Sequence, residues 1–451
     1  MEKIAARIKK YIPKSIFYAV RPLYHFLLAF FAALVYRFPS RALVVIGVTG
    51  TKGKTTVVEV LHAMVAASGA AVASSSSLRF RIGDEEVAND LKMTMPGRFF
   101  LQKFLRRAVS VGCRYVVIEV TSEGIAQFRH RFIDFDIAVM TNVAPEHIES
   151  HGGFEEYVRA KLDLFWRLAS RDVAIINRDD ALHQRFAAAT AASKVWYGNS
   201  GIVWKDREWR IEDAKIDSRG IEFRLREMRG AAARADECVV ASSLEGIFNL
   251  YNLLAATAAA LVLRLDNTAI REGVERVKNI AGRMEWIQKE PFGVVVDYAH
   301  TPDSLKKVYT FLREWTSRFP PPASRLICVL GAAGGGRDKW KRPEMGRIAA
   351  EFCHQIILTN EDPYDEDPAR ILSEIKSGIT GDQLLVTKVM ADRREAIRAA
   401  VRSGREGDVI VITGKGAEPW IMGSDGTRIS WDDRAAAREE LMENRKAMKI
   451  G

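Results

Sequence analysis

The 451-residue sequence predicts an α/β protein in which two doubly wound units follow a short N-terminal helical extension. Two observations support this prediction. Short apolar runs rich in β-branched residues alternate with helical stretches along most of the chain, and a glycine-rich turn directly follows the first of these runs. We expect the extension to cover residues 1–42, the central domain residues 43–282 and the C-terminal domain residues 283–451.

The central domain is predicted from buried parallel strands and from a helix after the first strand. The strands are expected at Leu43–Val48, Tyr115–Val120, Ile137–Thr141 and Val173–Ile176, and the helix at Thr55–Ser68. From about residue 200 to residue 240 the pattern changes to the alternation typical of antiparallel edge strands. We expect these strands at Val203–Ile211, Ala214–Ile216 and Ile221–Leu225, followed by a helix at Asn249–Leu263.

The C-terminal domain repeats the alternation of strands and helices. Its strands are expected at Val294–Asp297, Leu326–Leu330, Gln355–Thr359 and Val409–Thr413. Its helices are expected at Asp303–Glu314, Pro343–Cys353, Pro368–Ser377 and Asp392–Val401. The parallel strands of both domains would thus end in loops that face a ligand.

Charge and cysteine content narrow the classes of partner. The formal net charge is +10 and the sequence pI about 9.3, but no run of five basic residues and no familiar nucleic-acid module occurs, which argues against a nucleic-acid partner. The four cysteines, at 113, 238, 328 and 353, include no C-x-x-C pair. We therefore expect neither a disulfide framework nor a zinc site, but small core residues in a reducing compartment.

The N-terminal extension allows two interpretations. Residues 1–14 are basic, and Tyr24–Tyr36 is a nearly unbroken apolar run that is shorter than the roughly 18–20 residues needed to span a bilayer. The segment fits an interfacial helix that contacts a membrane surface through residues 1–40. It equally fits a helix packed on the protein's own core or on another subunit.

The glycine-rich turn at Gly50–Thr56 (GTKGKTT) predicts a phosphate-binding loop. Its glycines let backbone N–H groups turn toward phosphate oxygens, and the following helix adds the positive end of its dipole. Lys54 would reach the β- and γ-phosphates, and the Thr55 hydroxyl would bind Mg²⁺. The spacing is slightly irregular, because Val48 stands where the common motif has its first glycine.

Three further residues of the central domain are candidate site residues only because the phosphate-binding loop is predicted near them. Glu119 ends a predicted strand and is placed to bind Mg²⁺, although an ordinary strand-end acid would look the same. His147 follows another strand and is a metal ligand or a structural histidine. Lys161 lies on a helix that begins near Phe154, and its spacing alone indicates only a solvated lysine.

Polar motifs also follow the strands of the C-terminal domain. They are 297–302 (DYAHTP), 331–342 (GAAGGGRDKWKR) and 414–418 (GKGAE). The second combines glycines with four cations, which suits a phosphate or a carboxylate. We therefore expect a nucleotide and an acceptor to meet in a cleft between the two domains.

Taken in order, these motifs resemble those of the Mur ligases, and the loop also resembles that of folylpolyglutamate synthetases. The stretch 119–124 (EVTSEG) is similar to the E-V-S-S-H-G of MurE-type ligases, the UDP-N-acetylmuramoyl-tripeptide synthetases. Further matches are Gln127 and Arg129, Thr141-Asn142 with His147, Lys161 on its helix, Asn249 and Asn252, Gly282-Arg283, 297–302, 335–343, 414–418 and Asp433-Arg434. The resemblance extends from about residue 43 to the end of the chain.

The resemblance implies a P-loop-type central ATPase domain, a Rossmann-like C-terminal domain, and an ATP-dependent amide ligase that works through an acyl-phosphate. Lys54, Lys161, His147 and Glu119 would be catalytic, and Thr55, Glu119, His147 and a carbamylated Lys161 would bind Mg²⁺. ATP would contact Gly50, Thr51, Lys52, Gly53, Lys54, Thr55, Thr56, Asn249, Arg283, Asp297 and His300, with Tyr298 nearby. The peptide acceptor and the incoming amino acid would contact Thr94, Ser122, Gln127, Arg129, Arg337, Lys341, Glu361, Asp362, Tyr364 and Glu418.

The sequence departs from the MurE pattern in ways that bear on the substrate. The UDP-binding domain that precedes the ATP loop in MurE enzymes is not expected here, so a lipid-linked acceptor becomes an alternative. Tyr364 replaces the arginine of the D-N-P-R motif of diaminopimelate enzymes, which argues against diaminopimelate. We expect Glu361, Asp362 and Glu418 to favour a basic amino acid such as lysine or ornithine. Glu123 and Ala417 stand where the family has histidine, and Glu146 where it has aspartate.

Two other functions remain open from the sequence. One is a folylpolyglutamate synthetase-like glutamate ligase, which the motifs at 297–302 and 335–338 disfavour. The other is a non-catalytic, membrane-associated nucleotide-binding protein, which would have no need to keep Lys54, Glu119, His147 and Lys161 together. We expect a monomer in the cytoplasm or at the inner face of the membrane, with small-molecule and peptide substrates.

Overall fold

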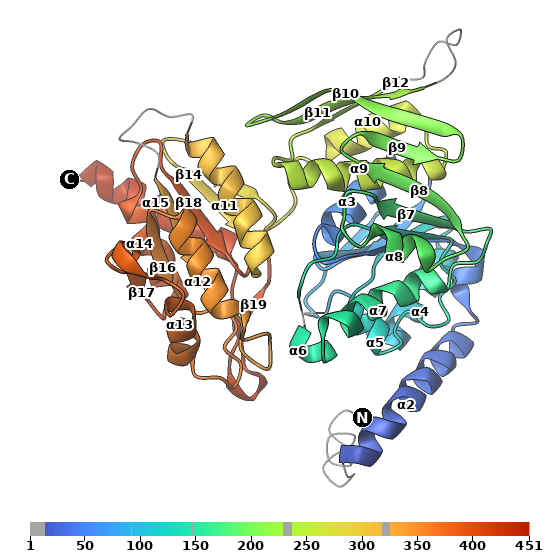
Figure 1. The fold of residues 1–451 in the computed structure, drawn as a ribbon, viewed down its shortest axis with the longest axis horizontal. Coiled ribbons are helices and arrows are strands. Elements are labelled where there is room, and N and C mark those ends of the chain that lie inside the picture. The colour runs from blue at the N-terminus through green and yellow to red at the C-terminus, as the bar shows by residue number, and fades with distance from the viewer. Residues whose placement is uncertain (1–13, 92, 147, 229–236, 318–324, 451) are drawn as a thin grey trace.

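The computed structural model describes residues 14–91, 93–146, 148–228, 237–317 and 325–450. Two sheets, each covered by helices on both faces, lie side by side, and helix α2 (Lys14–Val35) projects from the first of them (Figure 1). The α/β fold class predicted from the sequence is confirmed. His147 lies outside the described residues, as do residues 1–13 of the basic N-terminal segment.

The first sheet has a parallel centre and antiparallel edges. Its strand order is β12-β11-β10-β9-β8-β7-β6-β1-β5-β2-β3-β4. The parallel strands are β1 (Val44–Thr49), β2 (Val72–Ser75), β5 (Tyr115–Glu119), β6 (Ile137–Met140), β7 (Val173–Asn177) and β8 (Ser193–Gly198). The antiparallel strands are β3 (Arg79–Ile82) and β4 (Glu85–Ala88) at one edge, and β9 (Gly201–Trp204), β10 (Arg207–Asp217), β11 (Gly220–Glu227) and β12 (Glu237–Ser242) at the other.

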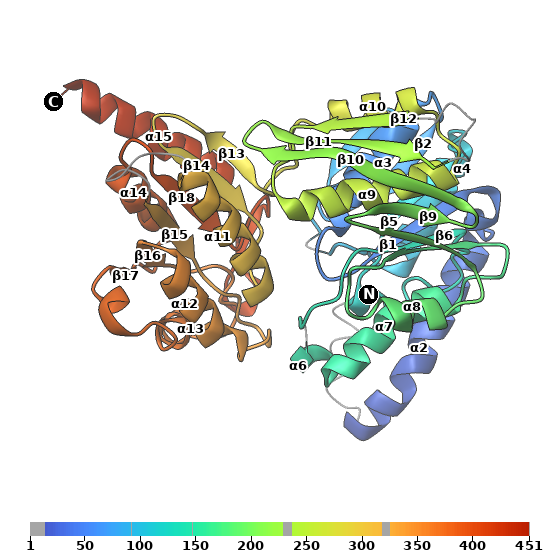
Figure 2. The same cartoon turned by 45° about the horizontal axis from the view of Figure 1, so that its top comes forward.

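Helices cover both faces of this sheet because its central strands are apolar on both sides. One face packs against α3 (Lys54–Ala67), α9 (Ile247–Val262) and α10 (Asn267–Arg276). The other packs against α4 (Arg98–Ser110), α5 (Ser122–Ala126), α7 (Phe154–Trp166) and α8 (His183–Ala188). Figure 2 shows the long hairpin of β10 and β11 lying beyond the parallel strands.

The antiparallel region corrects the predicted strand limits. The run Val203–Ile211 was expected as one strand, but a turn at Lys205-Asp206 divides it between β9 and β10. Lys205 has a φ of 57° there. The segment Ala214–Ile216 belongs to β10 instead of forming its own strand, because a bulge between Glu212 and Lys215 lets the strand continue past the irregular register.

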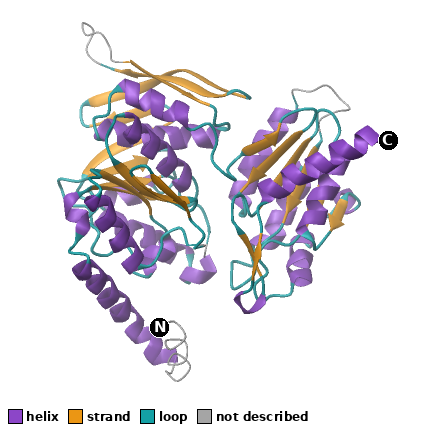
Figure 3. Cartoon of the chain, turned by 180° about the vertical axis from the view of Figure 1, so that it is seen from behind, coloured by secondary structure: helices purple, strands orange, loops and turns teal. Residues whose placement is uncertain are grey.

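The second sheet has six strands in the order β13-β14-β18-β15-β16-β17. They are β13 (Glu285–Gln288), β14 (Gly293–Asp297), β15 (Leu326–Leu330), β16 (Gln355–Leu358), β17 (Thr387–Val389) and β18 (Val409–Thr413). Helices α11 (Pro302–Thr316), α12 (Lys341–Phe352) and α13 (Pro368–Lys376) cover one face, and α14 (Arg393–Ser403) and α15 (Asp433–Ile450) the other, as Figure 3 shows from behind. A small hairpin, β19 (Trp420–Met422) with β20 (Arg428–Ser430), lies apart from both sheets.

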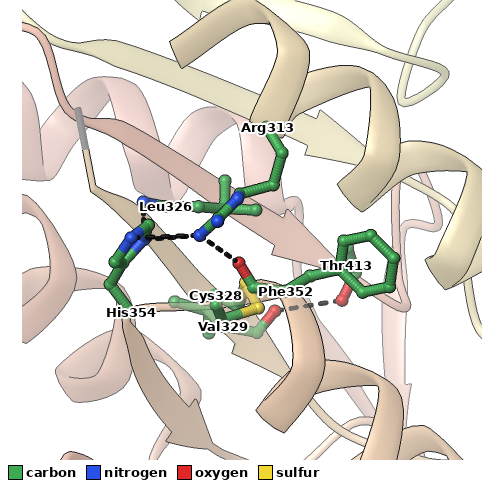
Figure 4. Close-up of a disulfide and its surroundings, with 8 residues drawn as sticks. Arg313, Leu326, Cys328, Val329, Phe352, His354 and Thr413 are labelled. Carbon is green, nitrogen blue, oxygen red and sulfur yellow. Dashed lines mark hydrogen bonds between the residues drawn. A yellow bond between two sulfur atoms is a disulfide. The ribbon is translucent and has the colours of Figure 1, made fainter. Parts of the chain in front are cut away.

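Two of the four cysteines do not fit the prediction of free thiols. Cys328, in the middle of β15, and Cys353, which ends α12, form a disulfide with their Cα atoms 6.0 Å apart (Figure 4). The fold brings them together because α12 runs back along the sheet that β15 belongs to, which no local spacing could indicate. Cys113 and Cys238 are free and buried, as expected.

Helix α2 packs on the central domain through one narrow stripe. Ala29, Ala32 and Ala33 are buried, and the helix lies against α4. Among the described residues, no helix is both long enough and apolar enough to cross a membrane. The short helices η1 (Pro39–Ala42), α6 (Ile148–His151), η2 (Gly381–Leu384) and η3 (Ser424–Gly426) complete the described elements.

Candidate active site

A cavity of about 730 Å³ lies between the two domains, at the carboxyl ends of the parallel strands of both sheets. Most of the residues predicted from the sequence line it. They are Gly50, Thr51, Lys52, Gly53, Lys54, Thr55, Thr56, Thr94, Glu119, Ser122, Arg129, Lys161, Asn249, Arg283, Asp297, Tyr298, His300, Arg337, Lys341, Glu361, Asp362, Tyr364 and Glu418. Gln127 does not line the cavity; its Oε1 accepts a hydrogen bond from Arg129 Nη2 at 2.8 Å.

The glycine-rich loop between β1 and α3 is fixed by the end of β6. Thr141 Oγ1 donates to the Lys52 carbonyl at 2.7 Å, and Asn142 Oδ1 accepts from the Lys52 N–H at 3.0 Å. Gly50 has a φ of 148°, and a Cβ at that position would collide with the Thr141 hydroxyl. The loop therefore requires glycine there, both for its backbone conformation and for its contact with β6.

Lys54 lies folded over this loop. Its Nζ donates to the carbonyls of Gly50 at 3.1 Å and Thr51 at 2.9 Å, while Glu119 Oε1 lies 4.0 Å away. Burial lowers the pKa of Lys54, and the carboxylates of Glu119 and Glu146 act in the opposite direction. An anionic phosphate in the cavity would provide the counter-charge that the backbone carbonyls cannot.

Two oxygens beside the loop suit a hard divalent cation. Thr55 Oγ1 donates to Glu119 Oε2 at 3.0 Å, and the same carboxylate oxygen accepts from the Ser77 N–H at 3.0 Å. No cluster of three or more His, Cys, Asp or Glu side chains able to hold a metal exists among the described residues. One carboxylate and one hydroxyl nevertheless fit Mg²⁺, which keeps several waters and takes its other ligands from substrate phosphates.

Lys161, on α7, is the most deeply enclosed cation of the central domain. Its side chain is buried, Nζ donates to the Gly50 carbonyl at 2.7 Å, and it lies 4.5 Å from the ring centre of Tyr157. Burial first, and then the charge of Lys54, hold the pKa of Lys161 well below its usual range. Lys161 is thus enclosed by the protein, so the solvated-lysine interpretation is wrong.

A charged bridge joins the two domains across the cavity. Glu146 Oε1 lies 2.7 Å from Lys52 Nζ and 3.0 Å from His300 Nε2. Burial, followed by the charge of Lys52, lowers the pKa of His300 to about 3, so the ring is neutral. Asp338 adds a second bridge by accepting from the Glu149 N–H at 2.9 Å. Glu146 therefore acts across the domain boundary, which its place after a strand could not indicate.

Three residues predicted to border the nucleotide make contacts within the protein itself. Asp297 is buried and accepts from the N–H groups of Met284 at 2.7 Å and Ala299 at 2.7 Å. Arg283 stacks 4.1 Å from the ring centre of Tyr298. Asp297 thus holds the chain where one domain passes into the other, and its carboxylate is already occupied.

Contacts in the C-terminal domain change the expectation that three acids favour a basic incoming amino acid. Lys415 is fully buried, and its Nζ lies 2.8 Å from Asp362 Oδ1 and 2.7 Å from Glu418 Oε2. Two of the three acids expected to attract a cationic side chain therefore share one buried ammonium group, which offsets one of their two charges. Lys415 was named in the sequence only within its motif, and its role depends on a contact across 53 positions.

The amino-acid sequence matches known families over most of its length. Residues 48–260 match the Mur ligase middle domain, and residues 282–416 match the Mur ligase glutamate ligase domain. A UDP-N-acetylmuramoyl-L-alanyl-D-glutamate–2,6-diaminopimelate ligase from Geobacillus thermodenitrificans is 35% identical over 427 residues, covering 93% of this chain and 83% of that protein. A UDP-N-acetylmuramyl-tripeptide synthetase from a Roseiflexus strain is 37% identical over 435 residues, covering 92% and 82%.

Solved structures give the same result. The structure of a UDP-N-acetylmuramoyl-L-alanyl-D-glutamate–2,6-diaminopimelate ligase is 30% identical, with a TM-score of 0.57, and the match covers 89% of this chain and 79% of that one. A folylpolyglutamate synthase from Mycobacterium tuberculosis complexed with ADP has a TM-score of 0.65 but only 18% identity, over 87% and 92% of the chains. The second likeness concerns the fold alone and gives the glutamate-ligase alternative less support.

Proposed function

This chain belongs to the Mur ligase family, and on that premise we propose that its substrates are ATP, a muramyl-type peptide ending in a free carboxylate, and one amino acid. The family match shows an ATP-dependent ligase of cell-wall precursor synthesis. The observation that supports the assignment to this cavity is the position of Lys54, Glu119 and Lys161 around one phosphate-type loop.

The proposed reaction has two steps. An oxygen of the acceptor carboxylate attacks the γ-phosphorus of ATP, the bond from that phosphorus to the bridging oxygen breaks, and ADP leaves. The amine of the incoming amino acid then attacks the acyl carbon of the resulting acyl-phosphate, phosphate leaves and the amine loses a proton. Lys54 would move from the Gly50 and Thr51 carbonyls to the transferring phosphoryl group, whose charge it stabilises.

Thr55 and Glu119 are proposed to hold Mg²⁺, which when bound neutralises charge on the phosphate oxygens. Among this chain's own groups, Ser77 keeps the Glu119 carboxylate aimed at the loop through its N–H. His147 remains a predicted ligand. The bridge from Lys52 through Glu146 to His300 would hold the two walls together while the phosphate is transferred.

Lys161 is proposed to carry a carbamate. The deprotonated amine of Lys161 adds to CO₂, forming a carbon–nitrogen bond and releasing one proton, and the product is a carbamate anion. Burial, which lowers the pKa of Lys161, favours the deprotonated amine that this addition requires. Solution NMR of the protein in ¹³C-bicarbonate should show one carbamate carbon signal that is missing from Lys161→Arg. A spectrum without that signal, from active protein, would refute the proposal.

We propose that the selection against diaminopimelate depends on Tyr364, since Asp362 and Glu418 are both engaged by Lys415. The guanidinium of Arg337, which lines the same cavity, already interacts with Tyr364. A distal carboxylate that gains no guanidinium of its own costs about 1–3 kcal/mol. Lysine or ornithine should therefore be used in preference to diaminopimelate, and Tyr364→Arg should shift kcat/KM toward diaminopimelate by about 10–100-fold. A wild-type preference for diaminopimelate would overturn this assignment.

The assay for the main proposal is phosphate release from ATP and Mg²⁺ with a panel of amino acids. Two acceptors should be compared, a UDP-muramoyl dipeptide and a sugar-free γ-glutamyl peptide, with Lys54→Ala as the blank. Release that requires both an acceptor and one amino acid, with formation of the amide product, would establish the ligase. Release that needs neither would indicate an ATPase, and binding without release would favour the non-catalytic alternative.

A further inference from the structure

Helix α2 presents a second apolar stripe on the side that does not touch the protein. Val20, Leu23, Tyr24, Leu27, Phe31 and Leu34 follow the i, i+3, i+4, i+7 spacing of one helix face, and each is between 41% and 58% exposed. The buried alanines of α2 face the opposite way. Figures 1 and 2 show the N-terminal part of the helix extending beyond the central domain.

A cluster of cations lies where α2 meets the central domain. His25 Nε2 is 3.3 Å from Arg21 Nε, and its Nδ1 is 2.6 Å from Arg98 Nη2. Arg98 also donates to the Gln127 carbonyl, and the Gln127 side chain accepts from Arg129. Arg129 also donates to the Met95 carbonyl, and the charge of Glu123 acts on it. The buried Nε of Arg98 has no hydrogen-bond partner among the described residues.

This cluster contains more donors than it can satisfy internally. Both ring nitrogens of His25 face guanidinium groups, which can only donate, whereas a neutral imidazole offers one acceptor. Burial, followed by the charges of Arg98 and Arg21, lowers the pKa of His25 to about 4, so the ring cannot be charged at neutral pH. An anion with several oxygens would accept from all of these groups.

The cluster also connects the cavity to the exposed stripe. Arg129 lines the cavity that holds Lys54 and Glu119, whereas Arg21 lies on α2 itself. Residues 1–41 contain eight lysines and arginines and a single acid, Glu2. A basic segment with an exposed apolar stripe is the combination that lies in the surface of an anionic membrane.

We propose that the acceptor peptide is carried on a lipid phosphate or pyrophosphate, with α2 lying in the membrane surface and the Arg21–His25–Arg98–Arg129 cluster binding the phosphate oxygens. The peptide would then extend past Arg129 into the cavity, and the lipid chain would follow the exposed stripe of α2. This inference rests on the proposed ligase function and specifies the acceptor class.

The membrane part is tested by co-sedimentation of the full chain with vesicles of phosphatidylcholine, with and without anionic phosphatidylglycerol. Wild type should bind the anionic vesicles, and Leu27→Glu/Phe31→Glu should bind at least about tenfold more weakly. Leu385→Glu, at an apolar residue that is 86% exposed far along the chain, is the matched control and should bind like wild type. Equal binding by wild type and the double variant would overturn the membrane contact.

The phosphate part is tested by calorimetric titration with farnesyl pyrophosphate and with inorganic pyrophosphate. Wild type should bind the farnesyl compound more tightly, and Arg98→Gln should weaken that binding at least about tenfold, whereas Arg347→Gln on the exposed face of α12 should not. Equal affinity for the two ligands would assign the cluster to a free anion and refute the lipid. Neither binding assay requires turnover, so a protein that passes both but forms no amide would contradict the ligase function alone.

Discussion

The interior of the C-terminal domain and the phosphate loop of the central domain differ in how they pair their buried cations. In the C-terminal domain, Arg393 makes a two-pronged pair with Asp433, and Lys415 is held between two carboxylates. In the central domain, Lys54 and Lys161 donate to backbone carbonyls, and the pKa of each is lowered, chiefly by burial. The paired cations are therefore part of the scaffold, whereas the underpaired ones mark where an anionic ligand completes the structure.

The largest effect should come from breaking a paired cation. Asp433→Asn leaves the guanidinium of Arg393 buried without its counter-charge, and both side chains are at most 1% exposed. We expect the free energy of unfolding to fall by about 3–5 kcal/mol. Urea denaturation measures it, and a loss below about 1 kcal/mol would show that the pair contributes little to the scaffold.

The underpaired cation should behave in the opposite way. Lys54→Met should reduce ATP-dependent turnover by about 10²–10³-fold, because the phosphoryl group loses its main cationic contact. The free energy of unfolding without ATP should stay the same or rise, since a desolvated charge is removed. Parallel phosphate-release and urea measurements separate the two effects, and a clear loss of stability would contradict the difference between the two regions.

His62, on α3, is a buried base that can be compared with the underpaired lysines. Burial, then the charges of Arg81 and Arg79, lowers its pKa to about 3, so the unfolded chain takes up a proton near pH 6.5 before the folded chain does. The contribution of His62 to the free energy of unfolding is therefore complete above pH 6.5. It is lost as the pH falls toward 3, by up to about 1.4 kcal/mol per pH unit. His62→Gln should flatten that slope, and an unchanged slope would contradict the assignment.

The smallest effect should come from an exposed pair. Arg185 and Glu155 lie 2.7 Å apart, but their side chains are 39% and 63% exposed. Arg185→Ala should change the free energy of unfolding by less than about 1 kcal/mol, because water screens the interaction. A larger loss in urea would mean that exposure is a poor guide to which cations matter in this protein.

The sequence predicted the parts of the fold that carry a strong local pattern. The predicted parallel strands are continuous apolar runs, and the strand, loop and helix around Gly50–Thr56 follow from adjacent residues. The parallel strands β2 and β8 were not predicted, because polar residues interrupt their apolar pattern. Strand β4 was not predicted because all four of its residues are exposed and it has no apolar face. The disulfide was missed for a related reason, since only the packing of α12 on the sheet brings its cysteines together.

The residues of the candidate site also differ in whether a local sequence pattern or a tertiary contact identifies them. Lys54 is recognisable because it begins the helix after the glycine-rich loop, and Glu119 because it ends a strand. Ser77, Tyr157 and Lys415 gain their positions from tertiary contacts: the N–H of Ser77 orients Glu119, and the Tyr157 hydroxyl lies 2.7 Å from Thr51 Oγ1. Local spacing carries no signal for such contacts, so the roles of these three residues could not be predicted.

The position of β1 in its sheet also affects how the chain is made. β1 pairs with β5 on one side and β6 on the other, so its second neighbour does not exist until synthesis has reached Met140. Until then the apolar backbone of β1 has an open edge, and the phosphate loop has no Thr141 or Asn142 to hold it. A nascent chain interrupted before Met140 would expose an aggregation-prone strand edge. A chaperone would therefore be needed most before synthesis reaches that residue.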